Sequence, residues 1–448
     1  MSISFLLDRF KEYVNNSAII SNNNTITYGE LLVKFEEASK YLKTNDIHPG
    51  EVIALCGDFT PNAIALILAL ISNNNIIVPF NLPIKEGETI KFEIADIEKG
   101  IVIDLETDEY KLVKYSGTGR HEYYQILRDR NASGLVLFTS GTSGFPKAAV
   151  HDFNKLLVKF KSVRRSLRTV NFLLFDHWGG LNTLFHTLSN CGVVLALRNR
   201  KPDSVCKFIE RFKIELLPVS PSFLNLLILS EVYKNYDLTS IQLITYGTEP
   251  MPENTLKRAK EVFPNVNFQQ TYGLIELGVL RSKSKSDDSL WVKLGGEGYE
   301  LRVVDSILQI KADSAMLGYL NADSPFTEDG YFITGDQVEV DGDYFKILGR
   351  KSEIINVGGD KVYPQEVENL ILGFENVLEV TVFGEKHVMM GNIVCAKVSL
   401  KSPEDHKEAI KRIKNQCKMN LQSFKVPVKI IIEEGPMFND RYKKTRKF

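Results

Sequence analysis

The sequence predicts an α/β fold, in which a large N-terminal domain of fused β/α subdomains is followed by a small α+β C-terminal domain. Two observations lead to this prediction. Short apolar runs alternate with longer helical stretches through residues 1–349, which is typical of parallel β/α units. After residue 350 the pattern changes to neighbouring strands with interspersed helices, which is typical of a separate α+β unit.

The N-terminal elements begin with a capping box, because Thr27 and Glu30 are spaced to cap a helix that continues with apolar residues on one face. Residues 52–55 and 76–80 read as strands on either side of a buried helix at 63–71. Five further strand-like runs follow the same alternation, at residues 135–138, 172–175, 193–197, 216–219 and 243–246.

The C-terminal elements follow a turn at Asp341-Gly342, which joins two predicted strands within residues 338–347. Tyr363-Pro364 opens a helix with acidic residues in its first turns, as the helix dipole favours. Strands are then expected at residues 378–383, 392–400 and 426–432, and a helix at 403–417. We therefore expect a second domain at residues 350–448.

Composition excludes several classes of protein. The 448 residues include 55 Lys and Arg and 56 Asp and Glu, so the formal net charge is −1, which argues against binding nucleic acid or coating an anionic membrane. The longest apolar run, residues 63–71, is shorter than the roughly 20 residues that cross a bilayer. The five scattered cysteines form no CxxC pair and predict neither a disulfide framework nor a zinc site. With an early charged residue in place of a secretory signal, we expect a cytoplasmic protein.

One loop offers a dense set of hydrogen-bond donors directly after the predicted strand at 135–138. Exposed backbone N–H groups, hydroxyls and an ammonium together suit a polyphosphate. The loop is not a Walker A motif, because Pro146 precedes its lysine and Ala148 follows it. The candidate nucleotide-binding residues in it are Thr139, Ser140, Gly141, Thr142, Ser143, Gly144 and Lys147.

This loop resembles the phosphate loop of the adenylate-forming (AMP-binding) superfamily, which contains acyl-CoA synthetases, peptide-synthetase adenylation domains and luciferases. Four more of its motifs follow in order, at residues 246–250, 270–276, 331–336 and 349–368. The chain most resembles a short acyl- or aryl-CoA ligase. The resemblance covers essentially the whole chain and implies that the small domain is mobile.

The resemblance assigns further residues to the ATP site. It implies ribose contacts for Asp336 and Arg350, and it places the Tyr272 ring beside adenine. Glu276 is a hard oxygen ligand that suits Mg²⁺ held between protein and phosphates. The remaining residues that it assigns to ATP binding are Gly247, Thr248, Glu249, Pro250 and Gly273.

The candidate acyl pocket lies at residues 175–180, for which two alignments are open. In the first, His177 resembles the aromatic gate of acyl- and aryl-CoA synthetases, and Trp178 and Gly180 belong to the pocket. In the second, Asp176 binds the ammonium of an amino-acid substrate. The Gly179-Gly180 pair favours the first alignment.

The C-terminal residues 437–447 resemble the closing motif of the superfamily, which places Lys443 at the catalytic lysine that bridges the acid carboxylate and the α-phosphate. Tyr442 stands where the motif has Gly, so Lys444 is the alternative. Ile275 replaces a threonine on the phosphate side. The resemblance also implies a hinge at Ser352 and a pantetheine-side loop at Gly358 and Gly359.

The predicted function is that of an AMP-forming carboxylic acid ligase. It would use ATP and Mg²⁺ to form acyl-AMP and pyrophosphate, and then transfer the acyl group to the thiol of CoA or of carrier-protein phosphopantetheine. Two alternatives stay open. One is an adenylation enzyme that loads an amino acid or acyl group onto an acyl carrier protein, and the other is a catalytically impaired nucleotide-binding homologue.

Overall fold

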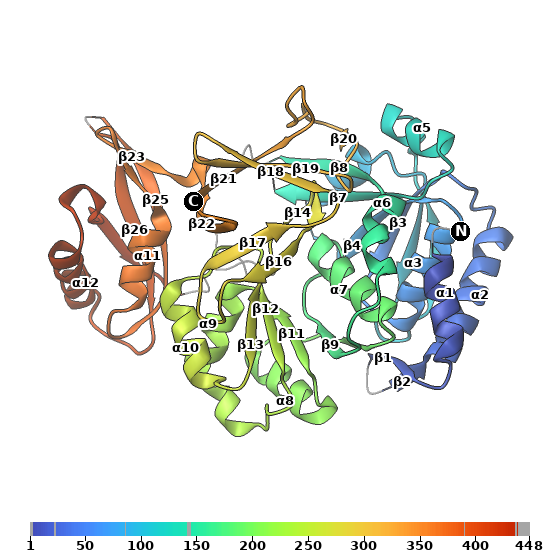
Figure 1. The fold of residues 1–448 in the computed structure, drawn as a ribbon, viewed down its shortest axis with the longest axis horizontal. Coiled ribbons are helices and arrows are strands. Elements are labelled where there is room, and N and C mark those ends of the chain that lie inside the picture. The colour runs from blue at the N-terminus through green and yellow to red at the C-terminus, as the bar shows by residue number, and fades with distance from the viewer. Residues whose placement is uncertain are drawn as a thin grey trace.

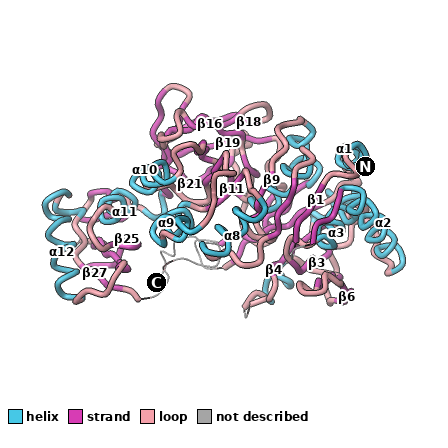
Figure 2. The backbone as a smooth tube through the Cα atoms, turned by 90° about the horizontal axis from the view of Figure 1, so that it is seen from below, coloured by secondary structure: helices cyan, strands magenta, loops and turns pink. Residues whose placement is uncertain are grey.

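The computed structural model describes residues 3–21, 24–85, 87–140, 145–388, 390–434 and 437. The described residues form four larger sheets with helices packed against them. Figure 1 shows the N-terminal elements at one end of an elongated molecule and the C-terminal elements β23–β26 with α11 and α12 at the other. Figure 2 shows the same separation from below, with α12 and β27 far from α1 and α2.

The first sheet holds the strands that flank the candidate phosphate loop. Its central strands β5, β3, β4 and β7 are parallel, whereas β8 runs antiparallel to β7. Every residue from Ala63 to Ile71 of α3 is buried, so this helix fills the space over the sheet. In order, the strands are β20 (Gly318–Tyr319), β8 (Pro146–Asp152), β7 (Gly134–Ser140), β4 (Ile76–Asn81), β3 (Val52–Gly57), β5 (Lys99–Ile103) and β6 (Tyr110–Lys114).

The second sheet is parallel except at the β1–β2 edge, and it carries the candidate adenine-side loop after β12. In order, its strands are β13 (Asn267–Gln270), β12 (Leu243–Tyr246), β11 (Leu216–Val219), β9 (Arg168–Asn171), β10 (Val193–Ala196), β1 (Ser17–Ser21) and β2 (Asn24–Thr27).

Helices connect and cover these two sheets. Thr27 caps α2, since its side chain accepts from Glu30 N and its own N–H donates to the Glu30 carboxylate. The helices are α1 (Ser4–Glu12), α2 (Tyr28–Thr44), α3 (Pro61–Ser72), α4 (Thr89–Ile94), α5 (Glu122–Asp129), α6 (Phe153–Leu157), α7 (Trp178–Ser189), α8 (Pro202–Phe212), α9 (Pro221–Ser230) and α10 (Glu253–Val262), with short 3₁₀ turns η1 (Val158–Lys161) and η2 (Val232–Asn235).

The third sheet is antiparallel and leads toward the C-terminal unit. The β21–β22 hairpin turns at residues 341–344, with Gly342 at a positive φ of 57°. Before this sheet, β14 (Gly273–Leu274) and β15 (Gly278–Val279) form a small hairpin. The strand order of the sheet is β16 (Arg281–Ser284), β17 (Trp291–Gly295), β22 (Tyr344–Arg350), β21 (Phe332–Asp341), β19 (Ile307–Ala312) and β18 (Tyr299–Val304).

The C-terminal sheet has its own buried cluster, which includes Val367, Val380 and Ile413. It begins after the 3₁₀ turn η3 (Lys351–Glu353). Its elements are β23 (Ile355–Val357), β24 (Asp360–Val362), α11 (Pro364–Leu372), β25 (Val377–His387), β26 (Gly391–Leu400), α12 (His406–Asn420), η4 (Ser423–Lys425) and β27 (Lys429–Ile432).

The predicted α/β class with a large N-terminal and a smaller C-terminal part is confirmed. The strand expected at 172–175 was misplaced, because the neighbouring strand β9 occupies Arg168–Asn171 instead. This strand pairs with β10 along its backbone, and it includes the polar residues Arg168 and Thr169, so a search for apolar runs does not detect it. Phe172 and Phe175 are buried just beyond the strand. The division at residues 349 and 350 stays a prediction.

The described residues contain no helix that is both long and apolar enough to cross a bilayer. All five cysteines are buried free thiols.

Candidate active site

Tyr272 and Arg350 both contact the buried carboxylate of Asp336. The Tyr272 hydroxyl donates to Asp336 Oδ2 at 2.6 Å, and Arg350 Nε lies 3.2 Å from Asp336 Oδ1. The β21–β22 register places Asp336 directly opposite Arg350, and Tyr272 follows the end of β13. Only 7% of Asp336 and 8% of Tyr272 are exposed, so the fold holds this carboxylate in place before any ligand binds.

Burial sets the protonation of this group. It raises the pKa of Asp336 above its usual range, and the Arg350 guanidinium and the Tyr272 hydroxyl oppose that rise. Burial and the adjacent Asp336 carboxylate raise the pKa of Tyr272 well above its ordinary value, so its hydroxyl stays a donor. Each carboxylate oxygen has two lone pairs, and Asp336 therefore keeps capacity to accept hydroxyl groups of a ligand.

A second group consists of Glu276, Tyr319 and Lys147. The Tyr319 hydroxyl donates to Glu276 Oε1 at 2.6 Å, and Lys147 Nζ lies 5.3 Å from the centre of the Tyr319 ring. Strand β20 pairs with β8 so that Tyr319 is opposite Ala149, two residues after Lys147. The lysine of the phosphate loop and the candidate metal ligand therefore approach the same tyrosine.

Arg350 connects the two groups electrostatically. Burial lowers the pKa of Arg350, but the Asp336, Glu276 and Tyr272 side chains raise it, with a net rise. Burial also raises the pKa of Tyr319. The Glu276 carboxylate raises this pKa further, whereas the positive charge of Arg350 lowers it. One site thus contains four of the charged residues that the sequence analysis singled out, namely Lys147, Glu276, Asp336 and Arg350. Its mixture of positive and negative charges suits a nucleotide, which has both phosphate and ribose groups.

Sequence reasoning missed two residues of this site, Tyr319 and Asn321. Asn321 accepts from Ala148 N at 3.0 Å and donates to Pro146 O at 2.9 Å, which fixes the strand immediately after the phosphate loop. Both residues lie more than 170 positions from that loop in the chain. They belong to none of the motifs, and only the β20–β8 pairing brings them to the site.

The candidate adenine-side loop packs beside Thr271. It consists of Gly247, Thr248, Glu249 and Pro250. A Cβ on Gly247 would lie 2.4 Å from Thr271 Oγ1, and Thr248 adopts a positive φ of 72°. The Glu249 carboxylate accepts from Ser222 N at 2.7 Å, at the start of α9. The structure therefore gives Glu249 a helix-capping contact in addition to its predicted place near ATP.

The candidate acyl-pocket residues begin α7. His177 Nδ1 accepts from Gly179 N at 3.0 Å and caps the helix. Trp178 is 2% exposed and packs edge-on against Phe153 in the main core. A Cβ on Gly180 would lie 2.2 Å from Leu174 O, so close packing requires this glycine. Core packing thus accounts for Trp178 and Gly180, while their roles in an acyl pocket stay predictions.

Other predicted residues lie farther from this site or outside the described residues. Ser352 lies in η3, directly after β22. Gly358 and Gly359, at positive φ, form the turn between β23 and β24, and Figure 1 shows β23 well separated from β7, β14 and β20. Thr139 pairs with Lys147 across β7 and β8. The Ser140 side chain and the residues Gly141, Thr142, Ser143, Gly144, Lys443 and Lys444 lie outside the described part.

Ile275, which replaces the expected threonine, packs against two hydrophobic clusters of the large domain. The Glu276 side chain that follows it still reaches Tyr319. The isoleucine at position 275 therefore anchors the backbone beside Glu276 by hydrophobic packing.

Comparison with known proteins places the chain in a family. Residues 7–332 match the family model of the AMP-binding enzymes, and residues 366–437 match that of the AMP-binding enzyme C-terminal domain. Indoleacetate–CoA ligase from Aromatoleum aromaticum is 24% identical over 436 residues, covering 85% of this chain and 84% of the relative. A 2-succinylbenzoate–CoA ligase from Listeria innocua is 24% identical over 460 residues, covering 96% and 95%.

Solved structures show the same fold. The anthranilate CoA ligase AuaEII in complex with anthranoyl-AMP superposes with a TM-score of 0.81 at 19% identity, covering 99% of this chain and 95% of that one. ATP-bound MatB from Rhodopseudomonas palustris gives a TM-score of 0.80 at 21% identity, with coverages of 97% and 96%. The predicted class, an AMP-forming acid–thiol ligase, is confirmed by these relatives, and the chain belongs to the family of AMP-binding enzymes.

Proposed function

We propose that this protein joins a carboxylic acid to CoA in two steps at one site. In the first step an acid oxygen attacks the α-phosphorus of ATP, and pyrophosphate leaves with the electrons of the broken P–O bond. In the second step the CoA sulfur attacks the acyl carbon, and AMP leaves. The observation that supports this most directly is the convergence of Asp336, Arg350, Glu276 and Lys147 described above.

In this proposal Asp336 binds the ribose. Tyr272 and Arg350 hold its carboxylate in place, so no reorganisation is needed when the ribose hydroxyls arrive. Lys147 and Arg350 supply positive charge toward the phosphates. Because acid and ATP are both anions, positioning and charge balance are the main demands on the protein.

Glu276 would hold Mg²⁺ together with the phosphates of ATP. Among the described residues no group of three or more His, Cys, Asp or Glu side chains could hold a metal on its own. A single carboxylate fits Mg²⁺ nonetheless, because this ion is commonly bound by one or two carboxylates plus substrate phosphates. Bound there, it would neutralise charge on the phosphates. Tyr319 orients the carboxylate through Oε1.

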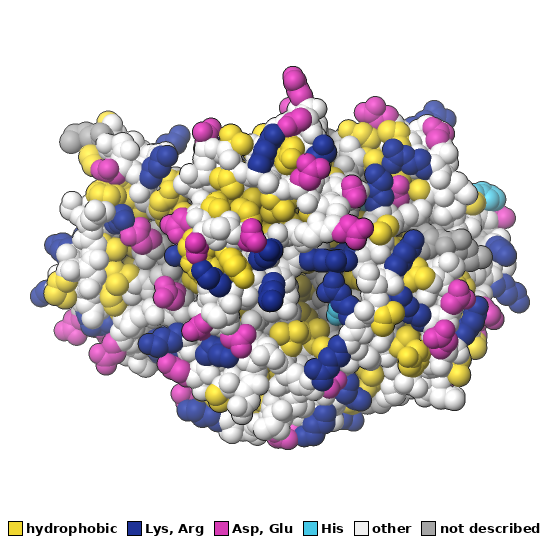
Figure 3. Space-filling view, in the orientation of Figure 1, with side chains coloured by type: hydrophobic (Ala, Val, Ile, Leu, Met, Phe, Trp, Pro, Cys, Tyr) yellow, Lys and Arg dark blue, Asp and Glu magenta, His cyan; other side chains and the backbone are white. Residues whose placement is uncertain are grey.

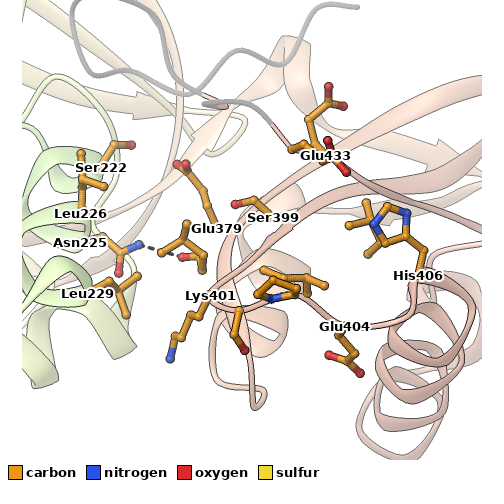
Figure 4. A pocket seen from close by; sticks show the side chains of 16 residues that line it. Ser222, Asn225, Leu226, Leu229, Glu379, Ser399, Lys401, Glu404, His406 and Glu433 are labelled. Atoms are coloured by element: carbon orange, nitrogen blue, oxygen red, sulfur yellow. Dashed lines mark hydrogen bonds between the residues drawn. The ribbon is translucent and has the colours of Figure 1, made fainter.

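We further propose that the small domain rotates about Ser352 between the two steps. Lys443 would serve the first step, and the loop of Gly358 and Gly359 would reach the site only in the second, since it lies away from the site here. A hinge rotation of this kind changes which groups reach the site between the two steps. A cavity of about 490 Å³ separates α9 from β25 and β26 (Figure 4), bridged in part by a hydrogen bond of 3.4 Å from Asn225 Nδ2 to Leu378 O.

The adenylation step is tested by pyrophosphate exchange into ATP, without CoA, over a panel of aryl, fatty, hydroxy and amino acids. Exchange with aryl or fatty acids, followed by thioester formation when CoA is added, is the expected result. Exchange with amino acids alone would favour loading of a carrier protein. Silence with the whole panel, while ATP still binds, would favour an impaired nucleotide-binding homologue. A cytoplasmic location, where CoA is available, is part of the same proposal.

The lysine assignment is tested by separating the two steps. Lys443→Ala should lower pyrophosphate exchange by about 10²-fold or more, because it removes a charge that is needed only while the adenylate forms. Thioester formation from supplied acyl-AMP and CoA should stay within about threefold of wild type. Lys444→Ala is the matched control, and the reverse pattern would move the role to Lys444. Equal loss of both steps in Lys443→Ala would contradict the two-state model.

A further inference from the structure

Lys159 is a partly buried lysine that the proposed mechanism does not use. It lies in the 3₁₀ turn η1 directly after α6, and its ammonium donates to Val279 O at 2.8 Å and to the side-chain oxygen of Asn182 on α7. Burial, together with the positive charges of Arg164 and Arg281, lowers the pKa of Lys159 to about 7. An ammonium has three donors, of which these contacts use two, and Lys159 Nζ also lies 5.0 Å from the centre of the Phe160 ring.

The surroundings of Lys159 are basic. His186 lies one turn beyond Asn182 on α7, and burial, followed by Arg164 and Lys159, lowers its pKa to about 4. Among the described residues no carboxylate forms an ion pair with Lys159, Arg164, His186 or Arg281. We call these four side chains the basic cluster. Arg164 and Arg281 are exposed cations, so the cluster would attract an anion that approaches from solvent.

The basic cluster is reachable from solvent. Lys159, Asn182 and His186 are each only partly buried, and Arg164 and Arg281 are exposed. Figure 3 shows Lys and Arg side chains, with a His side chain beside them, gathered over α7 near the middle of this face, next to a hollow in the surface. An anion can therefore approach without unfolding the structure.

Two elements connect the basic cluster to the acid side of the candidate site. Helix α7 begins at its N-cap His177, the candidate acyl gate, and Asn182 and His186 follow about 7 Å and about 13 Å along the axis. Val279 lies three residues after Glu276, and it pairs with Gly273 in the β14–β15 hairpin. The groups around Lys159 thus come from α7, whose N-cap is the candidate gate His177, and from the β14–β15 hairpin that contains Glu276.

We propose that the basic cluster binds a second anionic group of the acid substrate, so that the preferred substrates are dicarboxylic acids whose carboxylates are separated by a ring or several methylene groups. One carboxylate would react at the α-phosphate, and the other would pair with Lys159. This inference rests on the proposed ligase function. A purely structural role for Lys159, tying the hairpin to α7, explains its two hydrogen bonds but not the three further basic groups around it.

The test compares matched acids in pyrophosphate exchange, adipate against hexanoate and 4-(2-carboxyethyl)benzoate against 3-phenylpropanoate. Wild type should prefer the diacid of at least one pair. Lys159→Met should raise the KM for that diacid about 10- to 100-fold and leave the monoacid within about threefold. Lys155→Met, an exposed lysine four residues earlier, is the matched control and should change neither. Arg281→Gln and His186→Gln should weaken the diacid selectively if Lys159→Met does not fold.

Three outcomes would overturn the inference. If the wild-type protein exchanges with the monoacids but with neither diacid, a binding site for a second carboxylate is excluded. An equal fall in kcat for both members of a pair in Lys159→Met would identify a structural tie. Heat-stability measurements provide the third, because a rise in Tm with inorganic sulfate but not with adipate or 4-(2-carboxyethyl)benzoate would indicate a site for free anions. Absence of exchange with every acid would instead refute the proposed function. In that case, a rise in Tm that occurs only with a diacid, and that Lys159→Met abolishes, would still support the second anion site.

Discussion

The nucleotide side and the acid side of the candidate site balance their charges in opposite ways. On the nucleotide side, Asp336 is held by Arg350 and by the Tyr272 hydroxyl, so its charge is compensated within the protein. On the proposed acid side, the charges that act on Lys159 are the positive ones of Arg164 and Arg281. A compensated side is organised before its ligand arrives, whereas an uncompensated side gains most of its stabilisation from the ligand.

The largest expected effect comes from breaking the compensated side. Asp336→Asn keeps the size of the side chain but removes the charge that Arg350 faces and that the ribose needs. Pyrophosphate exchange should fall by about 10²- to 10³-fold in kcat/KM for ATP, as is typical when a preorganised polar group is lost. Asp341→Asn is the control, because this exposed residue of the same strand makes only a surface pair with Lys285 at 2.7 Å. A loss within threefold in Asp336→Asn would refute its ribose role.

A smaller effect should follow from Tyr319→Phe, which removes the donor to Glu276 but keeps the ring beneath Lys147. A hydrogen bond to a charged group is worth about 1.5–3 kcal/mol, so kcat should fall about 10-fold at saturating ATP. The Mg²⁺ concentration needed for half-maximal exchange should rise in the same variant. Tyr331→Phe removes a comparable hydroxyl contact to Glu300 on the exposed surface and should change neither quantity. A normal Mg²⁺ dependence in Tyr319→Phe would place the metal elsewhere.

The residues of the compensated side could be singled out from sequence motifs, whereas those of the uncompensated side could not. Asp336, Arg350, Tyr272 and Glu276 are recognisable because each lies in a short motif whose neighbours build the same local backbone. Tyr319 reaches the site only through the pairing of β20 with β8, and no local pattern encodes a contact between strands so far apart.

Lys159 escaped prediction for a related reason. A lysine between two apolar stretches reads as a solvated charge at the edge of a helix. Its burial depends on Val279 and Asn182, which come from two other elements. The α/β class follows from alternation along the chain, and the capping box of α2 follows from two residues. A site assembled from η1, α7 and β15 depends instead on their packing together.

The smallest expected effect tests the acid side through pH. A lysine whose pKa falls to about 7 on folding binds fewer protons in the folded state than in the unfolded state between pH 7 and its ordinary value near 10.5. The contribution of Lys159 to the free energy of unfolding should therefore rise with pH over this interval. Because Lys159 is only partly buried, we expect a rise of about 1–2 kcal/mol between pH 7 and pH 9.

Urea denaturation at the two pH values measures this difference directly. Lys159→Met should remove the rise, whereas Lys155→Met should keep it, because that exposed lysine contributes no comparable burial. A bound diacid should also flatten the dependence in wild type, since its second carboxylate favours the charged ammonium in the folded state. A pH dependence identical in wild type and Lys159→Met would show that the ammonium is already solvated or compensated, and the contrast between the two sides of the site would then no longer hold.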